Sequence, residues 1–278
     1  MKILYIAEIV GKSGIYAFKK AIGELKKKET PDFIIACGDG ATGGSGLGRN
    51  HAAYIHKLGA NVITTGEFCF YKKDLTEYFE KTNYVLRPDN LNIEAPGIGS
   101  RVFKIGNNKI AVAVLLGQSG FNRIHSNNPF SGLSAMLERL KQETQIVFID
   151  FHAQATAEKK TLFVMAKGHC SAIVGSHTRV QTADETILNG TAFITDAGRT
   201  GSSLSVGGCE TASRITEYIS GIPDWTKDAW EKPELQGVVI EIADDGKASS
   251  IKRIQYPLQT PAENATESQQ QVESISES

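Results

Sequence analysis

Short apolar runs alternate with amphipathic segments through the first third of the chain. The apolar runs have the length and composition of buried strands in a parallel sheet. They are residues 2–10, 32–37 and 61–65. Apolar residues recur at helical spacing over residues 15–25, and a further helix is expected over residues 51–58. This alternation predicts right-handed crossovers and a largely parallel sheet.

Hairpins and two more buried strands are predicted later in the chain. Turn residues between apolar runs indicate hairpins with loops at 106–108, 189–190 and 244–246. Residues 146–151 and 172–175 are buried-strand patterns, and each run is followed by a histidine. Between the first hairpin and these strands, Asn128-Pro129 is expected to open a helix. We therefore expect one α/β domain over residues 1–257, in which helices cover two sheets.

The end of the chain has a different composition. Residues 258–278 are rich in Ser, Gln and Glu and contain few apolar side chains. Such a segment cannot bury enough apolar surface to offset the entropy lost on ordering. We predict a disordered acidic and polar tail over these residues.

Polar side chains stand where the predicted strands end. Glu8, Asp39 and Glu67 lie at the ends of the first three strands, and His152 and His177 follow the two later ones. Ligands bind outside the carboxyl ends of parallel strands, and imidazole and carboxylate groups coordinate metal ions. The sequence therefore predicts a shared metal site. Simpler interpretations remain open. Glu8 and Asp39 could cap helices, and the two histidines could be structural residues held by hydrogen bonds.

Composition and charge narrow the possible partners. The 278 residues carry a formal net charge of −1, which gives no electrostatic reason to expect DNA or membrane binding. The N-terminus lacks a signal-peptide pattern, and no apolar run is long enough to cross a bilayer. The four cysteines form no close pair, so neither a disulfide framework nor a CxxC zinc site is indicated. Free thiols are typical of a cytoplasmic protein.

Four stretches resemble motifs of the calcineurin-like metallophosphoesterases, and more closely those of their YmdB-like branch. They are Ile6-Ala-Glu-Ile-Val-Gly11, Leu86-Arg-Pro-Asp-Asn90, Phe148-Ile-Asp-Phe-His-Ala-Gln-Ala-Thr156 and Val174-Gly-Ser-His-Thr-Arg-Val-Gln-Thr-Ala-Asp184. The resemblance implies a four-layer α/β/β/α sandwich with two metal ions, iron or manganese. It also implies hydrolysis of phosphodiesters, with 2′,3′-cyclic nucleotides as substrates, and assembly into homo-oligomers.

The chain departs from the family pattern at the residues that carry this chemistry. The first motif has Glu8 in place of Asp, and the bridging acid is Asp39 in place of Glu. Gly40 stands where the family has Asn. In the family's Gly-Asn-His motif, Glu67 replaces the amide and Phe68 replaces the catalytic histidine.

The last motif also differs, because Arg179 stands where the family has a second histidine after His177. By resemblance, the first metal would use Glu8, Asp39 and residue 179, so it loses a ligand and faces a guanidinium that has no lone pair for a metal. We predict that Arg179 occupies this region and pairs with Glu8 or Asp39. The alternative is that Arg179 points to solvent.

The second metal set, by resemblance Asp39, Glu67, His152 and His177, is chemically complete. The sequence thus predicts a metallophosphoesterase-fold protein that resembles 2′,3′-cyclic-nucleotide phosphodiesterases, has little or no activity and holds at most one divalent metal. It would act as a binding, scaffold or regulatory protein for a phosphate-containing small molecule. The alternative is an active metal-dependent phosphodiesterase with a rearranged metal site.

Overall fold

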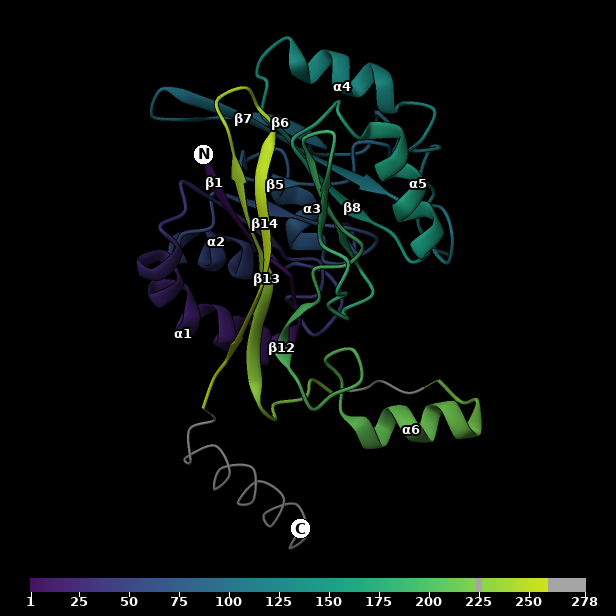
Figure 1. Cartoon of the computed structure of the whole chain (residues 1–278). Helices are drawn as coiled ribbons and strands as arrows, with labels where there is room; N and C mark the ends of the chain where they lie inside the picture. Colours follow the sequence, from purple (N-terminus) through teal and green to yellow (C-terminus); the bar gives the residue numbers. More distant parts are fainter. Residues whose placement is uncertain (224–226, 260–278) are drawn as a thin grey trace, which may run out of the picture.

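Two β-sheets lie face to face, and helices cover the outer surface of each (Figure 1). The computed structural model describes residues 1–223 and 227–259, so the predicted tail lies outside the described residues from residue 260 onward. The first sheet has the order β2 (Glu8–Ile9), β12 (Arg199–Ser202), β13 (Pro233–Ile242), β1 (Lys2–Ile6), β3 (Phe33–Cys37), β4 (Val62–Thr64) and β5 (Val85–Leu86), with β14 (Ala248–Pro257) paired to β13.

The second sheet is assembled from the middle of the chain. Its order is β10 (Thr186–Leu188), β11 (Thr191–Ile194), β9 (Ala172–Ser176), β8 (Val147–His152), β7 (Asn108–Leu116) and β6 (Ser100–Ile105). The helices are α1 (Gly11–Glu29), α2 (Arg49–Leu58), α3 (Lys73–Tyr78), α4 (Leu133–Lys141), α5 (Thr156–Ala166) and α6 (Thr211–Ser220). Figure 1 shows α6 standing away from the two sheets. None of the helices in the described residues is long and apolar enough to cross a membrane.

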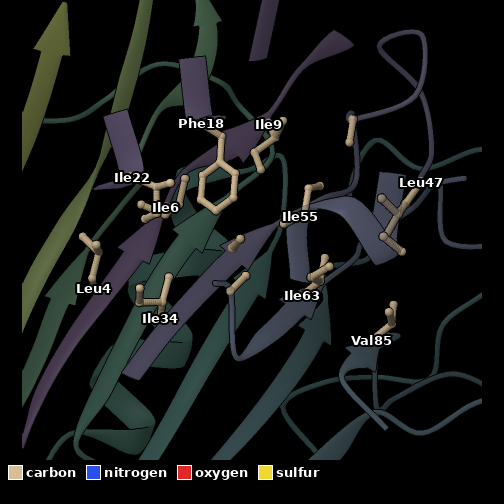
Figure 2. Packing of buried hydrophobic residues seen from close by; sticks show 14 of the residues in the cluster. Leu4, Ile6, Ile9, Phe18, Ile22, Ile34, Leu47, Ile55, Ile63 and Val85 are labelled. Atoms are coloured by element: carbon tan, nitrogen blue, oxygen red, sulfur yellow. The ribbon is translucent and has the colours of Figure 1, made fainter. Parts of the chain in front are cut away.

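Three hydrophobic clusters correspond to the three interfaces of a four-layer sandwich. Because successive side chains of a strand point to opposite faces, Leu4 and Ile6 pack under the helices while Tyr5 faces the second sheet. Figure 2 shows Leu4 and Ile6 together with Phe18 and Ile22 of α1. Full burial of a side chain such as Phe18 contributes about 1.5–3 kcal/mol. The predicted α/β/β/α architecture is confirmed.

The strands that carry or precede Asp39, Glu67, His152 and His177 are parallel within each sheet. Glu8 lies apart from them in β2, which is parallel to β12. Strands β1, β3, β4 and β5 form one parallel set, and β7, β8, β9 and β11 form another. Antiparallel strands flank both sets, with β13 next to β1, β6 next to β7 and β10 next to β11. The carboxyl ends of both parallel sets therefore bring their following loops to a common region.

Two expectations about individual elements are wrong. The run at residues 2–10 is two strands, because β1 pairs with β13 whereas β2 leaves that partner and pairs with β12. The helix expected from Asn128-Pro129 begins only at Leu133. The side chain of Asn128 accepts hydrogen bonds from the backbone N–H groups of Phe130 and Ser131, so a turn precedes the helix.

Candidate metal centre and adjoining pocket

Six side chains predicted from the sequence lie in the loops and strand ends at one edge of the two sheets. Two carboxylates and the two histidines form one group, and the remaining carboxylate and the arginine form a second group beside it. The first group is Asp39, Glu67, His152 and His177, and the second is Glu8 and Arg179.

Glu67 connects the two histidines. Its Oε1 lies 3.0 Å from Nδ1 of His177, and its Oε2 contacts Nε2 of His152. Asp39 completes the group, since its Oδ2 lies 3.6 Å from the same Nε2 of His152. The two imidazole rings are 5.1 Å apart between centroids. Four potential metal ligands, two of them carboxylates and two imidazoles, therefore face one small region.

Asp39 is held by the loop that follows the neighbouring strand β4. The backbone N–H groups of Gly66 and Phe68 donate to its two carboxylate oxygens over 2.6 and 3.2 Å. Gly66 is needed here, because a Cβ at this position would come within 2.4 Å of ring atoms of His152. Burial and the negative charge of Glu67 raise the pKa of Asp39 well above its usual value.

The orientation of His152 is set by a buried hydrogen-bond chain from inside the sheets. Ser176 donates its only hydroxyl proton to Asp150 over 2.7 Å, so it accepts a hydrogen bond from Nδ1 of His152 over 2.9 Å. Tyr5 and Thr64 donate to the other oxygen of Asp150 over 2.8 and 2.5 Å. This chain places a proton on Nδ1 and turns Nε2 toward the two carboxylates.

The charges around His152 call for a cation in this group. A lone pair on Nε2 would repel the oxygens of Glu67 and Asp39, unless a metal ion or a second proton lies between them. Burial lowers the pKa of His152, but the charge of Glu67 outweighs it and holds that pKa well above the usual value. Ligand atoms of Glu67, His152 and His177 all lie within 4.8 Å of one another. These residues fit one divalent cation, since imidazole and carboxylate ligands suit iron and manganese.

The second group is an ion pair. The Nε and Nη2 atoms of Arg179 both donate to Oε1 of Glu8, over 3.0 and 2.7 Å. The same guanidinium donates to the carbonyl oxygens of Gly207 and Gly44 over 2.9 and 2.8 Å. Burial lowers the pKa of Arg179, but the charge of Glu8 outweighs it and raises that pKa above its usual value. Arg179 thus contacts Glu8 as predicted and does not point to solvent.

Gly40 provides the room for this ion pair. A Cβ on residue 40 would lie 2.8 Å from Oε1 of Glu8 and 2.9 Å from Nη2 of Arg179. A longer side chain at this position would therefore displace the guanidinium. The space that a side chain at position 40 would need is occupied by the contact between Arg179 and Glu8.

The region around Glu8 does not fit a metal ion alongside this arginine. A guanidinium is a permanent cation without a lone pair, so it repels a dication and cannot coordinate it. Among the described residues, Oε2 of Glu8 is buried without a hydrogen-bond partner. The carboxylate of Glu8 nonetheless lies within 4.8 Å of potential ligand atoms of Cys37 and His152. Burial raises the pKa of the Cys37 thiol to about 12.

The loop after β9 supplies one side chain to each group, and its backbone is strained. His177 and Arg179 have φ angles of 93° and 60°, in the left-handed region that costs roughly 1–3 kcal/mol for residues other than glycine. Thr178 between them donates its N–H and hydroxyl to Asp196 over 2.9 and 2.6 Å. The fully buried ammonium of Lys159 donates to the same Asp196 oxygen over 2.7 Å. These contacts hold the loop in the conformation that sends adjacent side chains to different groups.

The helix-cap interpretation of the acids is wrong. Neither α1 nor α2 has a side-chain cap, and the residues at their N-cap positions are Val10 and Gly48. Glu8 lies in β2, and Asp39 accepts its hydrogen bonds from a different loop. Both acids therefore belong to the edge where the strands end.

A pocket of about 300 Å³ adjoins the first group on its solvent side. Phe68 lines it together with Glu67 and His177. Phe121 and Arg123 contribute from the loop after β7. Sequence reasoning missed this loop, because residues 117–127 carry no periodicity or motif. It also missed the chain from Asp150 to Ser176, although both residues lie within two positions of a predicted histidine.

Known proteins share both the sequence and the fold. The sequence profile described as YmdB-like protein matches residues 4–254. The 2′,3′-cyclic-nucleotide 2′-phosphodiesterase of Bacillus subtilis is 36% identical over 256 residues, which are 91% of this chain and 96% of that protein. A putative phosphatase/phosphodiesterase of Mycoplasma pneumoniae is 31% identical over 249 residues, which are 87% of this chain and 88% of that protein.

The comparison of structures agrees with the comparison of sequences. A crystal structure described as a novel phosphatase from Mycoplasma pneumoniae superposes with a TM-score of 0.88 at 30% identity, over 94% of this chain and 95% of that one. A putative 5′-nucleotidase from Staphylococcus aureus shares the fold alone, with a TM-score of 0.61 at 14% identity over 99% of this chain and 58% of that one. The chain therefore belongs to the YmdB-like protein family and has the metallophosphoesterase fold.

Proposed function

We propose that this chain binds a phosphate-containing small molecule with at most one divalent metal ion, and that it hydrolyses phosphodiesters slowly or not at all. The observation that carries the proposal is the contact of Arg179 with Glu8 over 2.7 Å. A guanidinium in this position supplies the positive charge that the family resemblance assigns to a first metal ion. The protein would then act as a binding, scaffold or regulatory protein.

The side chain at position 68 supports the same conclusion. Phe68 cannot donate or accept a proton, whereas a histidine at this position would lie beside the pocket. Loss of a general acid typically slows a reaction about 10²–10⁴-fold. Phe68 and Arg179 thus remove two separate contributions to hydrolysis.

The remaining metal position would be formed by Asp39, Glu67, His152 and His177. Iron or manganese is the metal expected from the family resemblance and from this set of ligands. When bound, such an ion supplies positive charge for phosphate oxygens. The name of the Bacillus subtilis relative makes a 2′,3′-cyclic nucleotide the first ligand to test.

Metal analysis combined with an activity assay tests the proposal. We expect no more than one iron or manganese ion per purified chain. We expect turnover of 2′,3′-cyclic AMP to be at least ~100-fold slower than that of the Bacillus subtilis relative, because a general acid is absent. Two tightly bound ions per chain, or rapid metal-dependent turnover, would contradict it.

Reversion of the two divergent residues sharpens the test. Phe68→His alone should restore little turnover, since Arg179 still occupies the first position. Phe68→His combined with Arg179→His should restore more turnover than either change alone and should raise the metal content above one ion per chain. If the single Phe68→His variant were as active as the double variant, Arg179 would not be what limits hydrolysis.

An active phosphodiesterase with a rearranged metal site is the second candidate. The observation that favours it is the complete set of ligands around Glu67, which contacts both histidines. If the unmodified protein shows metal-dependent turnover, His152→Ala should abolish it, because this change removes one of the four ligands. Turnover that persists after this change would exclude the second candidate.

The organisation of the protein also remains a proposal. We propose that residues 1–257 form a single domain, and the hydrophobic cluster shared by both sheets supports this. The cytoplasmic location, the homo-oligomeric assembly and the absence of DNA binding stay predictions.

A further inference from the structure

The segment between β12 and β13 forms an arm that carries α6 away from the two sheets (Figure 1). The arm consists of residues 203–223 and 227–232. In the part of the chain that the structure describes, α6 has no buried residue, whereas α1, α2, α4 and α5 each bury apolar side chains. An isolated helix shorter than about 12–15 residues is only marginally stable in water, because packing of an apolar face supplies most of the stability. With 10 residues, α6 therefore lacks the packing that normally stabilises a helix of its length.

One face of α6 is apolar and exposed. Ile215, Tyr218 and Ile219 have the i, i+3, i+4 spacing that places side chains on one side of a helix, and they are 51%, 77% and 82% exposed. Among the 256 described residues, seven of the fourteen large apolar side chains that are exposed lie in the 27 residues of the arm. The other four of these seven are Leu204, Val206, Ile222 and Trp230. Such a concentration marks a surface that contacts another molecule.

The arm carries enough apolar surface for a stable contact. With about 100 Å² for a fully exposed aliphatic side chain and about 200 Å² for an aromatic one, its seven exposed side chains offer roughly 500 Å². A standard protein interface buries about 800 Å² on each partner, and about 60% of that area is apolar. A contact formed by the arm alone therefore reaches the size of a stable interface.

The charges of α6 favour a second copy of the same chain as the partner. In a two-fold symmetric contact the same surface of both copies meets, so a net charge on that surface would repel itself. Arg214 and Glu217 are the only charged residues of α6, and they pair with each other over 2.5 Å. The helix thus has no net charge to attract an acidic or basic partner. It also lacks the several Lys or Arg residues that are typical of a helix bound to a membrane surface.

The base of the arm is fixed to the core, so α6 is presented in a defined orientation. The backbone N–H of Ser203 donates to the carbonyl oxygen of Lys232 over 3.0 Å, which joins the two ends of the arm. The side chain of Asp228 accepts a hydrogen bond from the N–H of Lys12 at the start of α1 over 3.1 Å. A surface that is already ordered loses less conformational entropy on association.

We propose that α6 is the contact between two copies of this chain, in which the apolar faces of the two helices pack against each other about a two-fold axis. The family resemblance predicts assembly but names no surface, and α6 supplies one. Neither the metal count nor the turnover of the protein enters into this inference, which goes beyond the proposed function.

Sedimentation of the purified full-length protein over a range of concentrations tests the contact. The unmodified protein should form a dimer with twice the 30.1 kDa of one chain, or a larger even-numbered assembly. Ile219→Asp places a charge on both sides of the contact. It should weaken association at least about 30-fold, as expected for a residue near the centre of an interface, and in a larger assembly it should at least halve the mass.

Val164→Asp is the matched control, because Val164 is also aliphatic and 55% exposed but lies on α5 outside the arm. It should leave association unchanged. The melting temperature gives a second readout. It should rise with protein concentration for the unmodified protein and for Val164→Asp, because association stabilises the folded chain, but not for Ile219→Asp. A cooperative unfolding transition shows that each variant is folded.

The inference would be overturned if the unmodified protein were a monomer at every concentration, or if Ile219→Asp kept the mass and the concentration dependence of Val164→Asp. Binding of a monomer to anionic vesicles, lost in Ile219→Asp, would assign the apolar face to a membrane surface instead. Each of these results leaves the metal count and the slow turnover of the proposed function intact.

Discussion

The two groups at the edge of the sheets balance the negative charge of their carboxylates in different ways. We call Glu8 and Arg179 the arginine group, and Asp39, Glu67, His152 and His177 the histidine group. In the arginine group, Glu8 is neutralised by Arg179 of the same chain, and Gly40 leaves the necessary space. In the histidine group, Asp39 and Glu67 face His152, and a full balance of charge needs an added proton or a metal ion. The cation of the arginine group is therefore a side chain of the protein. The cation that balances the histidine group would be a proton or a metal ion, both of which can exchange with solvent.

The two groups differ in the kind of cation that each can hold. A guanidinium is a fixed charge, whereas a metal ion can leave, exchange or bind phosphate oxygens. The loop that bears His177 and Arg179 supplies one side chain to each group. The strand and loop framework is therefore common to both groups, and the groups differ in the side chains that the loop supplies to them.

The largest expected effect comes from breaking the ion pair in the arginine group. Glu8→Met should destabilise the protein by about 3–5 kcal/mol, because it leaves the largely buried guanidinium of Arg179 without its counter-charge. The double variant Glu8→Met/Arg179→Met should be much closer to the unmodified protein. Urea denaturation of both single variants and the double variant measures the coupling.

The exposed pair of Lys109 and Glu143, with nitrogen and oxygen 3.5 Å apart, is the control for this cycle. Its coupling should be below about 1 kcal/mol, since exposed ion pairs are well solvated. A coupling between Glu8 and Arg179 as small as that of the control would refute the interpretation of the arginine group.

Removal of the Ser176 hydroxyl, which orients His152, tests metal binding by the histidine group. Ser176→Ala should weaken binding of iron or manganese about 10–100-fold, because outer-shell partners of a ligand histidine contribute this much to affinity. Titration with the metal measures the effect. Ser13→Ala is a matched control, because Ser13 is also fully buried, and its hydroxyl has no hydrogen-bond partner among the described residues. Equal metal affinities for the two variants would show that Ser176 does not position the histidine.

Gly40→Ala tests whether the arginine group needs the space beside it. The added Cβ meets Glu8 and Arg179, and crowding of this kind costs about 1–3 kcal/mol. Gly23→Ala within α1 is the control, since a Cβ there meets nothing within 4 Å, and it should stabilise the protein by about 0.5–1 kcal/mol. If the Gly40 variant melted at or above the temperature of the Gly23 variant, the close contact would be unimportant.

The smallest effect concerns the segment just after the shared loop. Burial raises the pKa of Asp184, but the ammonium of Lys160 and the hydroxyls of Thr195 and Thr182 outweigh it and hold that pKa below its usual value of 3.8. Stability from this carboxylate is therefore present above pH 3.8 and is lost as the pH falls below it. Asp184→Asn should cost roughly 1 kcal/mol or less at pH 7, because the pair with Lys160 is partly exposed.

Denaturation at several pH values measures this dependence. The difference between Asp184→Asn and the unmodified protein should shrink as the pH falls below 4. Glu143→Gln, a change in an exposed pair, should show a smaller difference at pH 7. A difference for Asp184→Asn that grows with acidification would have the wrong sign for the proposed linkage.

The sequence by itself determined the order of the elements and the edge at which the site lies. Apolar runs and helical spacing reflect local burial, so they predict strands and helices without knowledge of the partners. Parallel strands bring their carboxyl ends to one edge, which explains why residues as distant as Glu8 and His177 could be assigned to a common site. The sequence also led to the prediction that Arg179 pairs with Glu8 or Asp39.

Only the tertiary structure decided how these residues meet. Arg179 reaches Glu8 across 171 positions of sequence, and the contact depends on left-handed backbone in its own loop and on the absence of a side chain at Gly40. The division of residues 2–10 into two strands likewise followed from the arrival of β12 beside β2. Phe121 and Arg123 joined the pocket because an aperiodic loop folds back over the sheet edge. Such contacts join segments that are far apart in the chain, so they cannot be predicted from local sequence patterns.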